Sequence, residues 1–164
     1  MSWDFTHIED GAAEMVDVSD KPASKRRAVA AGSIALTDST ITSIRDDEVG
    51  KGNVLATARV GTIQAVKHTW ETIPLCHQIP ITNVETEFHV RESEVRLQVT
   101  VETIGQTGCE MEALQGVTTG LNVVWDMVKA AEKTDDGTYP ETAIRDVRVV
   151  EKTVERVPVS DDQR

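Results

Sequence analysis

The spacing of apolar residues changes several times along the chain, and each change predicts a new element of secondary structure. Residues 28–36 (AVAAGSIAL) form a run of small and apolar residues that predicts a strand. In residues 82–90 and 95–101, apolar side chains recur at every second position, which is the pattern of half-buried strands. The polar residues 91–94 are expected to join these two strands as a hairpin, and a last strand is expected around residues 143–150.

Other segments have the start and stop signals of helices. Cap candidates at residues 37–39 predict a short helical segment over residues 39–47. Asn53 is placed to cap a second helix that continues to residue 72, where Pro74 prevents its extension. The positions expected on the inner face of that helix are Leu55, Thr62, Val66, Trp70 and Ile73.

Residues 110–133 carry the strongest helical signal, and at about 100° per residue they sort into three faces. The first is large and apolar: Leu114, Val117, Leu121, Val124, Trp125 and Val128. The second is small or slender: Ala113, Gly116, Gly120, Val123, Met127 and Ala130. The third is a polar stripe: Glu112, Gln115, Thr119, Asn122, Asp126 and Lys129. A surface helix needs only one buried face, so the small-residue face predicts close approach by another helix, which we expect a second copy to supply.

The resulting order is strand, helices, strand, strand, helix, strand. This order predicts an α+β, ferredoxin-like (split βαβ) fold, with a four-stranded antiparallel sheet and helices packed on one face. Residues 28–150 would form the single domain. Residues 1–27 would be a partly ordered extension that ends in a cationic run, and residues 151–164 a charged, frayed tail.

Composition narrows the classes of function. The chain has 164 residues, with 28 acidic side chains against 17 basic ones and a net charge of −11, which argues against nucleic-acid binding. Abundant acids and few lysines suit a salt-loaded cytoplasm, where screening weakens repulsion, but they suit ordinary solubility equally well. No apolar stretch is long enough to span a bilayer and no secretion signal is evident, so a cytoplasmic protein with reduced Cys76 and Cys109 is expected.

Two segments could carry chemistry next to the predicted helices. Leu75-Cys76-His77 follows Pro74, where side chains often point into a cleft, although an isolated loop histidine is commonly only hydrogen-bonded. Adjacent residues in an extended segment point to opposite sides, so Cys76 and His77 do not predict a metal site. Glu110 and Glu112 open the long helix. They could bind donor groups of a ligand or simply complement the helix dipole.

The remaining candidates are charged residues with an ordinary alternative. Asp126 and Lys129 are three residues apart on one helix, and they could be an acid–base pair or a surface ion pair. Arg26, Lys51 and Lys67 could bind phosphate, and Lys51 lies between two glycines that permit close approach of a ligand. Each of these cations could equally be a solvated side chain. Lys51 is not part of a Walker loop, because the GxxxxGK[ST] frame is missing.

Several sequence blocks, taken together, are similar to the MoaC family from about Thr6 to about Val150. They are MVDVS (15–19), KG (51–52), ATAR (56–59), Gly61 with IQA (63–65), Lys67 with TW (69–70), IPLCH (73–77), TG (107–108), EMEAL (110–114), and DM (126–127) with KA (129–130). The LCH and EMEAL blocks are the most specific. The chain departs from many relatives in having Gln78 after the LCH triplet, which could shift the pocket wall, and in lacking a Gly/Ser/Lys-rich tail.

The resemblance implies a lyase that rearranges a cyclised dihydro-GTP into cyclic pyranopterin monophosphate and releases pyrophosphate, early in molybdenum cofactor biosynthesis. It implies that Asp126 is the catalytic acid, assisted by Lys51 and Lys129. The implied substrate-binding residues are Arg26, Lys67, Leu75, Cys76, His77, Glu110, Met111 and Glu112.

The resemblance also implies a hexamer built as a trimer of dimers in a prokaryote, and the acid-rich composition suits a salt-adapted one. It implies no metal site and no resident cofactor, and it leaves open whether Mg²⁺ accompanies the triphosphate. The alternative is a non-catalytic nucleotide- or pterin-binding regulatory module on the same fold. Such a module would not need Asp126 together with both lysines.

Overall fold

A computed structural model describes residues 8–9 and 12–157 of the chain; residues 1–7, 10–11 and 158–164 lie outside the described part. The first residues of the family resemblance, Thr6 and His7, and the end of the predicted tail therefore lie outside it as well. A two-residue pairing between β1 (Ile8–Glu9) and β2 (Ala12–Ala13) precedes the main sheet.

The main sheet has four strands, each paired antiparallel with its neighbours. They are β3 (Ser24–Ala35), β4 (Ile81–Val90), β5 (Glu94–Gly105) and β6 (Ala143–Arg156), in the spatial order β4-β5-β3-β6. The hairpin from β4 to β5 is the predicted one. The first and third strands of this sheet lie at its centre and the second and fourth at its edges, which is the ferredoxin-like order. The predicted α+β fold is confirmed.

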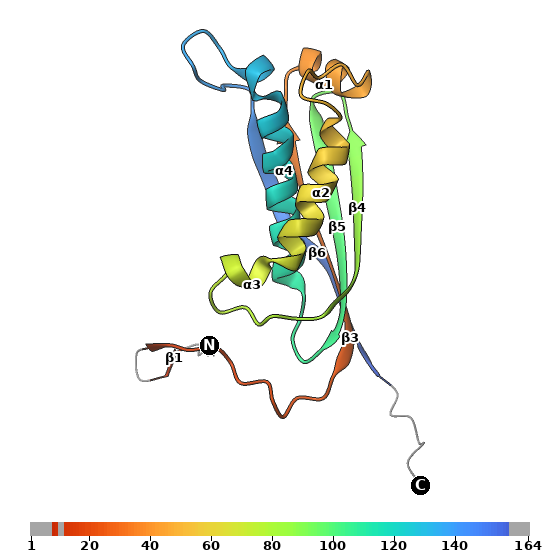
Figure 1. The fold of residues 1–164 in the computed structure, drawn as a ribbon, viewed down its shortest axis with the longest axis vertical. Coiled ribbons are helices and arrows are strands. Elements are labelled where there is room, and N and C mark those ends of the chain that lie inside the picture. The colour runs from red at the N-terminus through yellow and green to blue at the C-terminus, as the bar shows by residue number, and fades with distance from the viewer. Residues whose placement is uncertain (1–7, 10–11, 158–164) are drawn as a thin grey trace.

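The helices are α1 (Asp38–Arg45), α2 (Val54–Lys67), α3 (Thr69–Thr72) and α4 (Glu110–Glu132). Figure 1 shows α2 and α4 lying over the same face of the sheet, with α1 at one end of the pair and α3 at the other. None of the described helices is both long and apolar enough to cross a membrane.

The core lies between that face of the sheet and the apolar face of α4. Every second residue of β5 is fully buried there, and the matching positions of β3 and α4 are buried too: Val95, Leu97, Val99, Val101, Ala30, Ile34, Val117, Leu121 and Val124. Burying one Val, Leu or Ile side chain stabilises a fold by about 1.5–3 kcal/mol. The apolar face of the strands, which repeats every 2 residues, and that of α4, which repeats about every 3.6, therefore pack together in one core.

The small-residue face of α4 packs against α2 of the same chain. A Cβ atom added to Gly116 would stand 2.8 Å from Val66 Cγ2 of α2, and one added to Gly120 would meet the Thr62 hydroxyl of α2 and stand 2.5 Å from Leu97 Cδ2 of β5. Gly61 on α2 receives Val123 of α4 in the same way, at 2.8 Å. The expectation that a second copy covers this face was therefore wrong. The glycines let two helices of one chain approach closely.

The helix predicted over residues 54–72 is interrupted at His68. The Thr69 hydroxyl donates to the carbonyl of Ala65 at 3.0 Å, and this carbonyl also accepts the backbone N–H of His68 at 3.2 Å, an i→i−3 bond of the kind that tightens a last helical turn. The chain turns into α3, and Trp70 is 39% exposed instead of lying on the inner face. Thr62 and Val66, on the earlier turns, are buried as expected.

Two strands extend further than the sequence pattern indicated. β3 begins earlier than predicted, and β6 ends later. β3 begins at Ser24 and pairs with Gly105 and Arg156, so residues 24–27 belong to the sheet. β6 continues to Arg156, six residues beyond the predicted end, although residues 151–156 are exposed. An edge strand that is exposed on both faces has no apolar alternation, so the sequence pattern does not reveal it.

Candidate active site

Lys51, Asp126 and Lys129 form a cluster at the α1 end of α4, which we call the lysine–aspartate cluster. Lys51 Nζ donates to the backbone carbonyl of Asp126 at 2.6 Å and lies 3.4 Å from its Oδ2. Lys129 Nζ donates to Asp126 Oδ1 at 2.7 Å. All three side chains are exposed, so the cluster is open to a ligand. The structure thus brings together the three residues predicted to carry the chemistry.

The loop of residues 46–53 holds Lys51 over α4. Asn53 caps α2 by accepting a hydrogen bond from Ala56 N at 2.7 Å, and its amide donates to Asp47 Oδ1 at 3.0 Å. Gly52 has a φ of +105°, which a side chain would strain. The glycine after Lys51 therefore serves the turn that directs the lysine toward Asp126, and no Cβ contact constrains Gly50 or Gly52.

The charges of the cluster stabilise one another. The hydrogen bond from Lys129 and, after it, the contact with Lys51 lower the pKa of Asp126 below its ordinary value. Asp126 raises the pKa of Lys129 in turn. At neutral pH the cluster therefore holds a carboxylate between two ammonium groups. In this state Asp126 is a carboxylate beside both lysines, and its role as the catalytic acid stays what the resemblance implies.

A groove of about 560 Å³ is lined by the segment before β3, the start of β3, the segment after α3 and the loop that precedes α4. His77 lies in it and forms a 2.8 Å hydrogen bond between Nε2 and the carbonyl of Val16, which fixes the segment before β3 against the segment after α3. Arg26 also lines the groove, and its guanidinium donates to the carbonyls of Gly105 and Gln106 at 3.3 and 3.1 Å. Sequence reasoning named His77 and Arg26 but not the other lining residues: Val16, Val18, Lys21, Gln106, Thr107 and Gly108.

Two acids at the start of α4 have opposite electrostatic surroundings. Glu112 is 4% exposed, and burial, with the nearby charge of Glu110, raises its pKa to about 7. Burial acts to raise the pKa of Glu110, but the contact with Lys152 of β6, a hydrogen bond to the Glu110 backbone and the charge of Arg26 together outweigh burial and lower this pKa. Glu112 can therefore exchange a proton near neutral pH while Glu110 stays ionised. No sequence pattern pointed to Lys152, because the end of β6 that carries it was not recognised as a strand.

The two cysteines are free thiols with raised pKa values. Burial, and then the charge of Glu112, raise the pKa of Cys76, and the same effects raise that of the buried Cys109 to about 11. Neither thiol is activated as a nucleophile in these surroundings. Within the described residues, no group of three His, Cys, Asp or Glu side chains could hold a metal ion.

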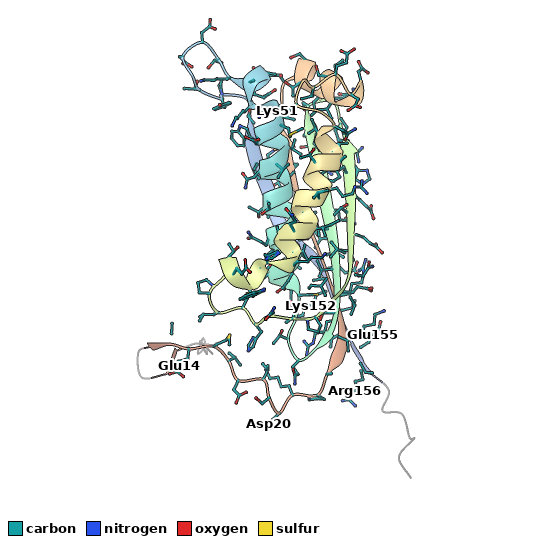
Figure 2. The ribbon with its side chains drawn as sticks, viewed as in Figure 1. Glu14, Asp20, Lys51, Lys152, Glu155 and Arg156 are labelled. Carbon is teal, nitrogen blue, oxygen red and sulfur yellow. The ribbon has the colours of Figure 1, made fainter. Side chains whose placement is uncertain are left out.

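The remaining predicted residues lie on the same end as His77. Lys67 ends α2 and is exposed, Met111 is 39% exposed, and Leu75 is partly buried. The predicted residues thus divide into two groups at opposite ends of α4, which is unbroken from Glu110 to Glu132. Figure 2 shows this separation directly, since Lys51 lies at one end of the sheet and Lys152 near the other. Glu112 and Asp126 are fourteen residues apart, or roughly 21 Å along the helix axis.

The protein is thus a ferredoxin-like α+β domain with one group of polar residues near each end of α4. Its sequence matches the model of the MoaC family over residues 15–154, and the chain belongs to this family. It is 71% identical over 146 residues to a probable cyclic pyranopterin monophosphate synthase of Halobacterium salinarum, which covers 88% of this chain and 90% of the relative.

Two further relatives agree with this assignment. A protein of Natronomonas pharaonis with the same name is 66% identical over 150 residues, which is 91% of this chain and 94% of the relative. A probable cyclic pyranopterin monophosphate synthase accessory protein of Methanothermobacter thermautotrophicus is 51% identical over 149 residues, again 91% and 94% of the two chains. The predicted family, with haloarchaeal relatives, is confirmed.

Proposed function

We propose that this chain is a cyclic pyranopterin monophosphate synthase that acts in the cytoplasm. It would convert a cyclised dihydro-GTP into cyclic pyranopterin monophosphate and release pyrophosphate, as a step of molybdenum cofactor biosynthesis. The observation that carries the proposal is the contact of Lys51, Asp126 and Lys129, three side chains from two separate segments that meet around one carboxylate. Membership of the MoaC family and the names of the relatives support it.

The cluster suits the proposed reaction. Closing a cyclic phosphate and releasing pyrophosphate moves negative charge onto the leaving group, and preorganised ammonium groups stabilise that charge. Rearranging the rings requires proton donors and acceptors, and the cluster holds a carboxylate beside two ammonium groups. In a chain of net charge −11, such a local group of cations is the means by which an anionic substrate can be held.

The second group of residues would bind the rest of the substrate. Arg26 and His77 line the groove, and Glu112, which is 4% exposed and is not part of the groove lining, can present either a carboxylate or a carboxyl group near pH 7. A carboxylate at that position would accept hydrogen bonds from the N–H groups of a purine- or pterin-like edge. Lys67, with an exposed ammonium, would contact phosphate.

One nucleotide-sized ligand does not bridge the roughly 21 Å between the two ends of α4. We therefore propose that each active site combines the lysine–aspartate cluster of one chain with the groove of another, in a homo-oligomer. The family resemblance favours a hexamer. The surface responsible is not the glycine face of α4, because α2 of the same chain covers it.

A regulatory module that only binds a nucleotide or pterin is the alternative. Such a module would need the groove but would not need the paired lysines around Asp126, so the observed contacts favour the enzyme. The proposal predicts that the purified protein, given the product of the upstream radical enzyme, forms a pterin that fluoresces after oxidation. Asp126→Ala should abolish product formation while the protein remains folded by circular dichroism.

Each outcome of this assay separates the two functions. A regulator would bind the substrate with no turnover in either protein. Turnover by the Asp126→Ala variant at the wild-type rate would remove Asp126 from the mechanism.

A further inference from the structure

The face of the sheet that points away from α2 and α4 carries a cationic pocket. Side chains of a strand alternate between the two faces, so the residues between the buried core positions point away from the helices, which Figure 1 shows on one face only. On the other face lies a cavity of about 280 Å³ whose lining includes Arg91, Arg96 and Arg148. We call it the arginine pocket. It contains none of the residues of the lysine–aspartate cluster or of the groove.

Small residues at the centre of the sheet make room for the arginine pocket. Ala31, Gly32 and Ser33 of β3 line it. Ser33 is the cross-strand partner of Arg96 on β5, and Ala31 is that of Arg148 on β6. Arg96 and Arg148 therefore stand on strands two apart, roughly 10 Å from each other, on either side of a floor that has no long side chain.

A β-bulge in β6 directs Arg148 to this face. Strict alternation would place Arg145 and Arg148, three residues apart, on opposite faces of the sheet. The register between β3 and β6 shifts between Ala31 and Ser33, and Asp146 has a φ of +57°. The extra residue lets Arg145 pair with Ser33 and Arg148 pair with Ala31, on the same face. Bulges often re-aim a side chain in this way beside functional sites.

Most of the hydrogen-bond donors of the arginine pocket are unused. Glu94, whose side chain is 16% exposed, holds Arg96 by accepting a 2.6 Å hydrogen bond from its Nε. Within the described part of the chain, the terminal nitrogens of Arg96 and the guanidinium of Arg91 donate to no other residue. Arg148 donates only to the backbone carbonyl of Asp146, at 3.4 Å. The pocket thus presents guanidinium donors that a ligand could accept from.

The charge of the lining indicates an anion of two negative charges. Three guanidinium groups face one carboxylate, that of Asp146, which leaves a surplus of two positive charges. The neighbouring Glu94 is shared between Arg96 and Arg145, at 2.6 and 3.3 Å, and so does not cancel this surplus. In a chain of net charge −11, such a surplus is a local reversal of sign.

The size and the donor type of the pocket narrow the class of anion. Guanidinium groups bind tetrahedral oxyanions with paired N–H donors, which gives both strength and geometric selectivity. A volume of about 280 Å³ lies at the lower limit of sites for drug-sized ligands, which occupy about 300–1,000 Å³. The pocket therefore suits a small inorganic oxyanion better than a whole nucleotide.

We propose that the arginine pocket is a binding site for a phosphate-type oxyanion, either orthophosphate or pyrophosphate. The terminal nitrogens of Arg91, Arg96 and Arg148 would donate to its oxygens. The proposal does not depend on the proposed function, because the pocket lies on the opposite face of the sheet from α4 and shares no residue with the candidate active site. Pyrophosphate is also the product released in the proposed reaction, so the site would respond to turnover.

The test measures anion binding to the full-length protein by isothermal titration calorimetry at constant ionic strength. Lys51→Ala is present in every protein compared, so that binding at the lysine–aspartate cluster is weakened equally in all of them. Adding Arg91→Gln and Arg148→Gln should weaken the binding of orthophosphate and of pyrophosphate at least about ten-fold. Lys25→Gln with Lys133→Gln removes the same charge outside the pocket, and should change both affinities less than about two-fold.

Arginine side-chain NMR locates the bound anion independently of affinity. The Nε–H resonances of Arg91 and Arg148, identified by their absence in the single variants, should shift as orthophosphate or pyrophosphate is added, with the midpoint found by calorimetry. The anion with the lower midpoint is the preferred ligand. Chloride at the same ionic strength should leave both resonances in place.

Three results would overturn the proposal. Equal losses of affinity in the two double variants would mean that overall charge governs binding. Resonances of Arg91 and Arg148 that stay in place, or that shift equally with chloride, would show that the pocket does not select this class of anion. Sedimentation of the Arg91→Gln, Arg148→Gln protein as a smaller assembly, with anion binding unchanged, would make the pocket a contact between copies of the chain.

Discussion

Glu112 is a buried acid at the first turn of α4 whose pKa, raised to about 7 by burial and the charge of Glu110, implies a cost in stability. An unfolded glutamate titrates near pH 4.3. Between that pH and about 7 the folded protein binds more protons than the unfolded chain, so the free energy of unfolding falls as pH rises through this window. Above pH 7 the Glu112 carboxylate is ionised and still buried, so the folded protein carries the full cost of this buried charge.

Glu112→Gln removes this titration while keeping the shape of the side chain. We expect the free energy of unfolding of the variant to match that of wild type at pH 4 and to exceed it by about 1–3 kcal/mol at pH 8. Denaturant unfolding at both pH values measures the difference. A constant difference between the two proteins across pH 4–8 would show that Glu112 titrates normally in the folded protein.

Lys51 and Lys133 are both exposed lysines in the same region, but only Lys51 contacts Asp126. We expect Lys51→Ala to reduce kcat/KM by at least about 100-fold, since both a charge and a hydrogen bond to the α4 backbone are lost, whereas Lys133→Ala should change it less than about three-fold. Steady-state kinetics at one ionic strength compares them. Equal losses would mean that overall charge, and not the geometry of the cluster, governs the reaction.

The sequence identified single residues better than it identified their partners. Asp126 and Lys129 could be paired from their helical spacing alone, because i and i+3 share a face. Lys51 reaches the same carboxylate from a distant loop, which only the family resemblance suggested. Lys152 was missed altogether, since its pairing with Glu110 depends on a strand that has no apolar pattern.

At the scale of elements, the α2–α4 contact depends on three glycines. Gly120→Ala would place its Cβ against Leu97 and the hydroxyl of Thr62, both in the packed interior. We expect a loss of about 1–3 kcal/mol in the free energy of unfolding. Gly50→Ala, where no atom lies within 4 Å of the added Cβ, is the control and should cost little. Chemical denaturation of the two variants distinguishes them, and similar midpoints would argue against close helix packing.

Element boundaries show where sequence patterns lose their information. The strands of the core and the length of α4 followed from periodicity, because one face of each is buried. The break at His68 did not, since the backbone and hydroxyl hydrogen bonds that close the last turn of α2 leave the apolar pattern unchanged. The small-residue face was recognised as a helix contact, but the sequence does not distinguish a helix of the same chain from one of another.

For the whole molecule, the separation of the two groups of site residues makes a prediction about assembly. Asp126→Ala and Glu112→Ala should each be inactive alone. Mixed under conditions that exchange subunits, they should recover part of the wild-type activity, because some sites then combine an intact lysine–aspartate cluster from one chain with an intact Glu112 from another. Mass spectrometry verifies the exchange, and an inactive mixture after complete exchange would indicate that each site is drawn from one chain.

The unbroken α4 also sets an angular relation between its ends. Fourteen residues at about 100° each complete nearly four turns, so Glu112 and Asp126 point in directions that differ by only about 40° around the helix axis. Deleting one residue between them would rotate one end by about 100° relative to the other and move it about 1.5 Å. The number of residues between Glu112 and Asp126 is therefore a constraint in its own right, whatever side chains lie between them. It fixes the relative directions of the two groups of polar residues around the axis of α4.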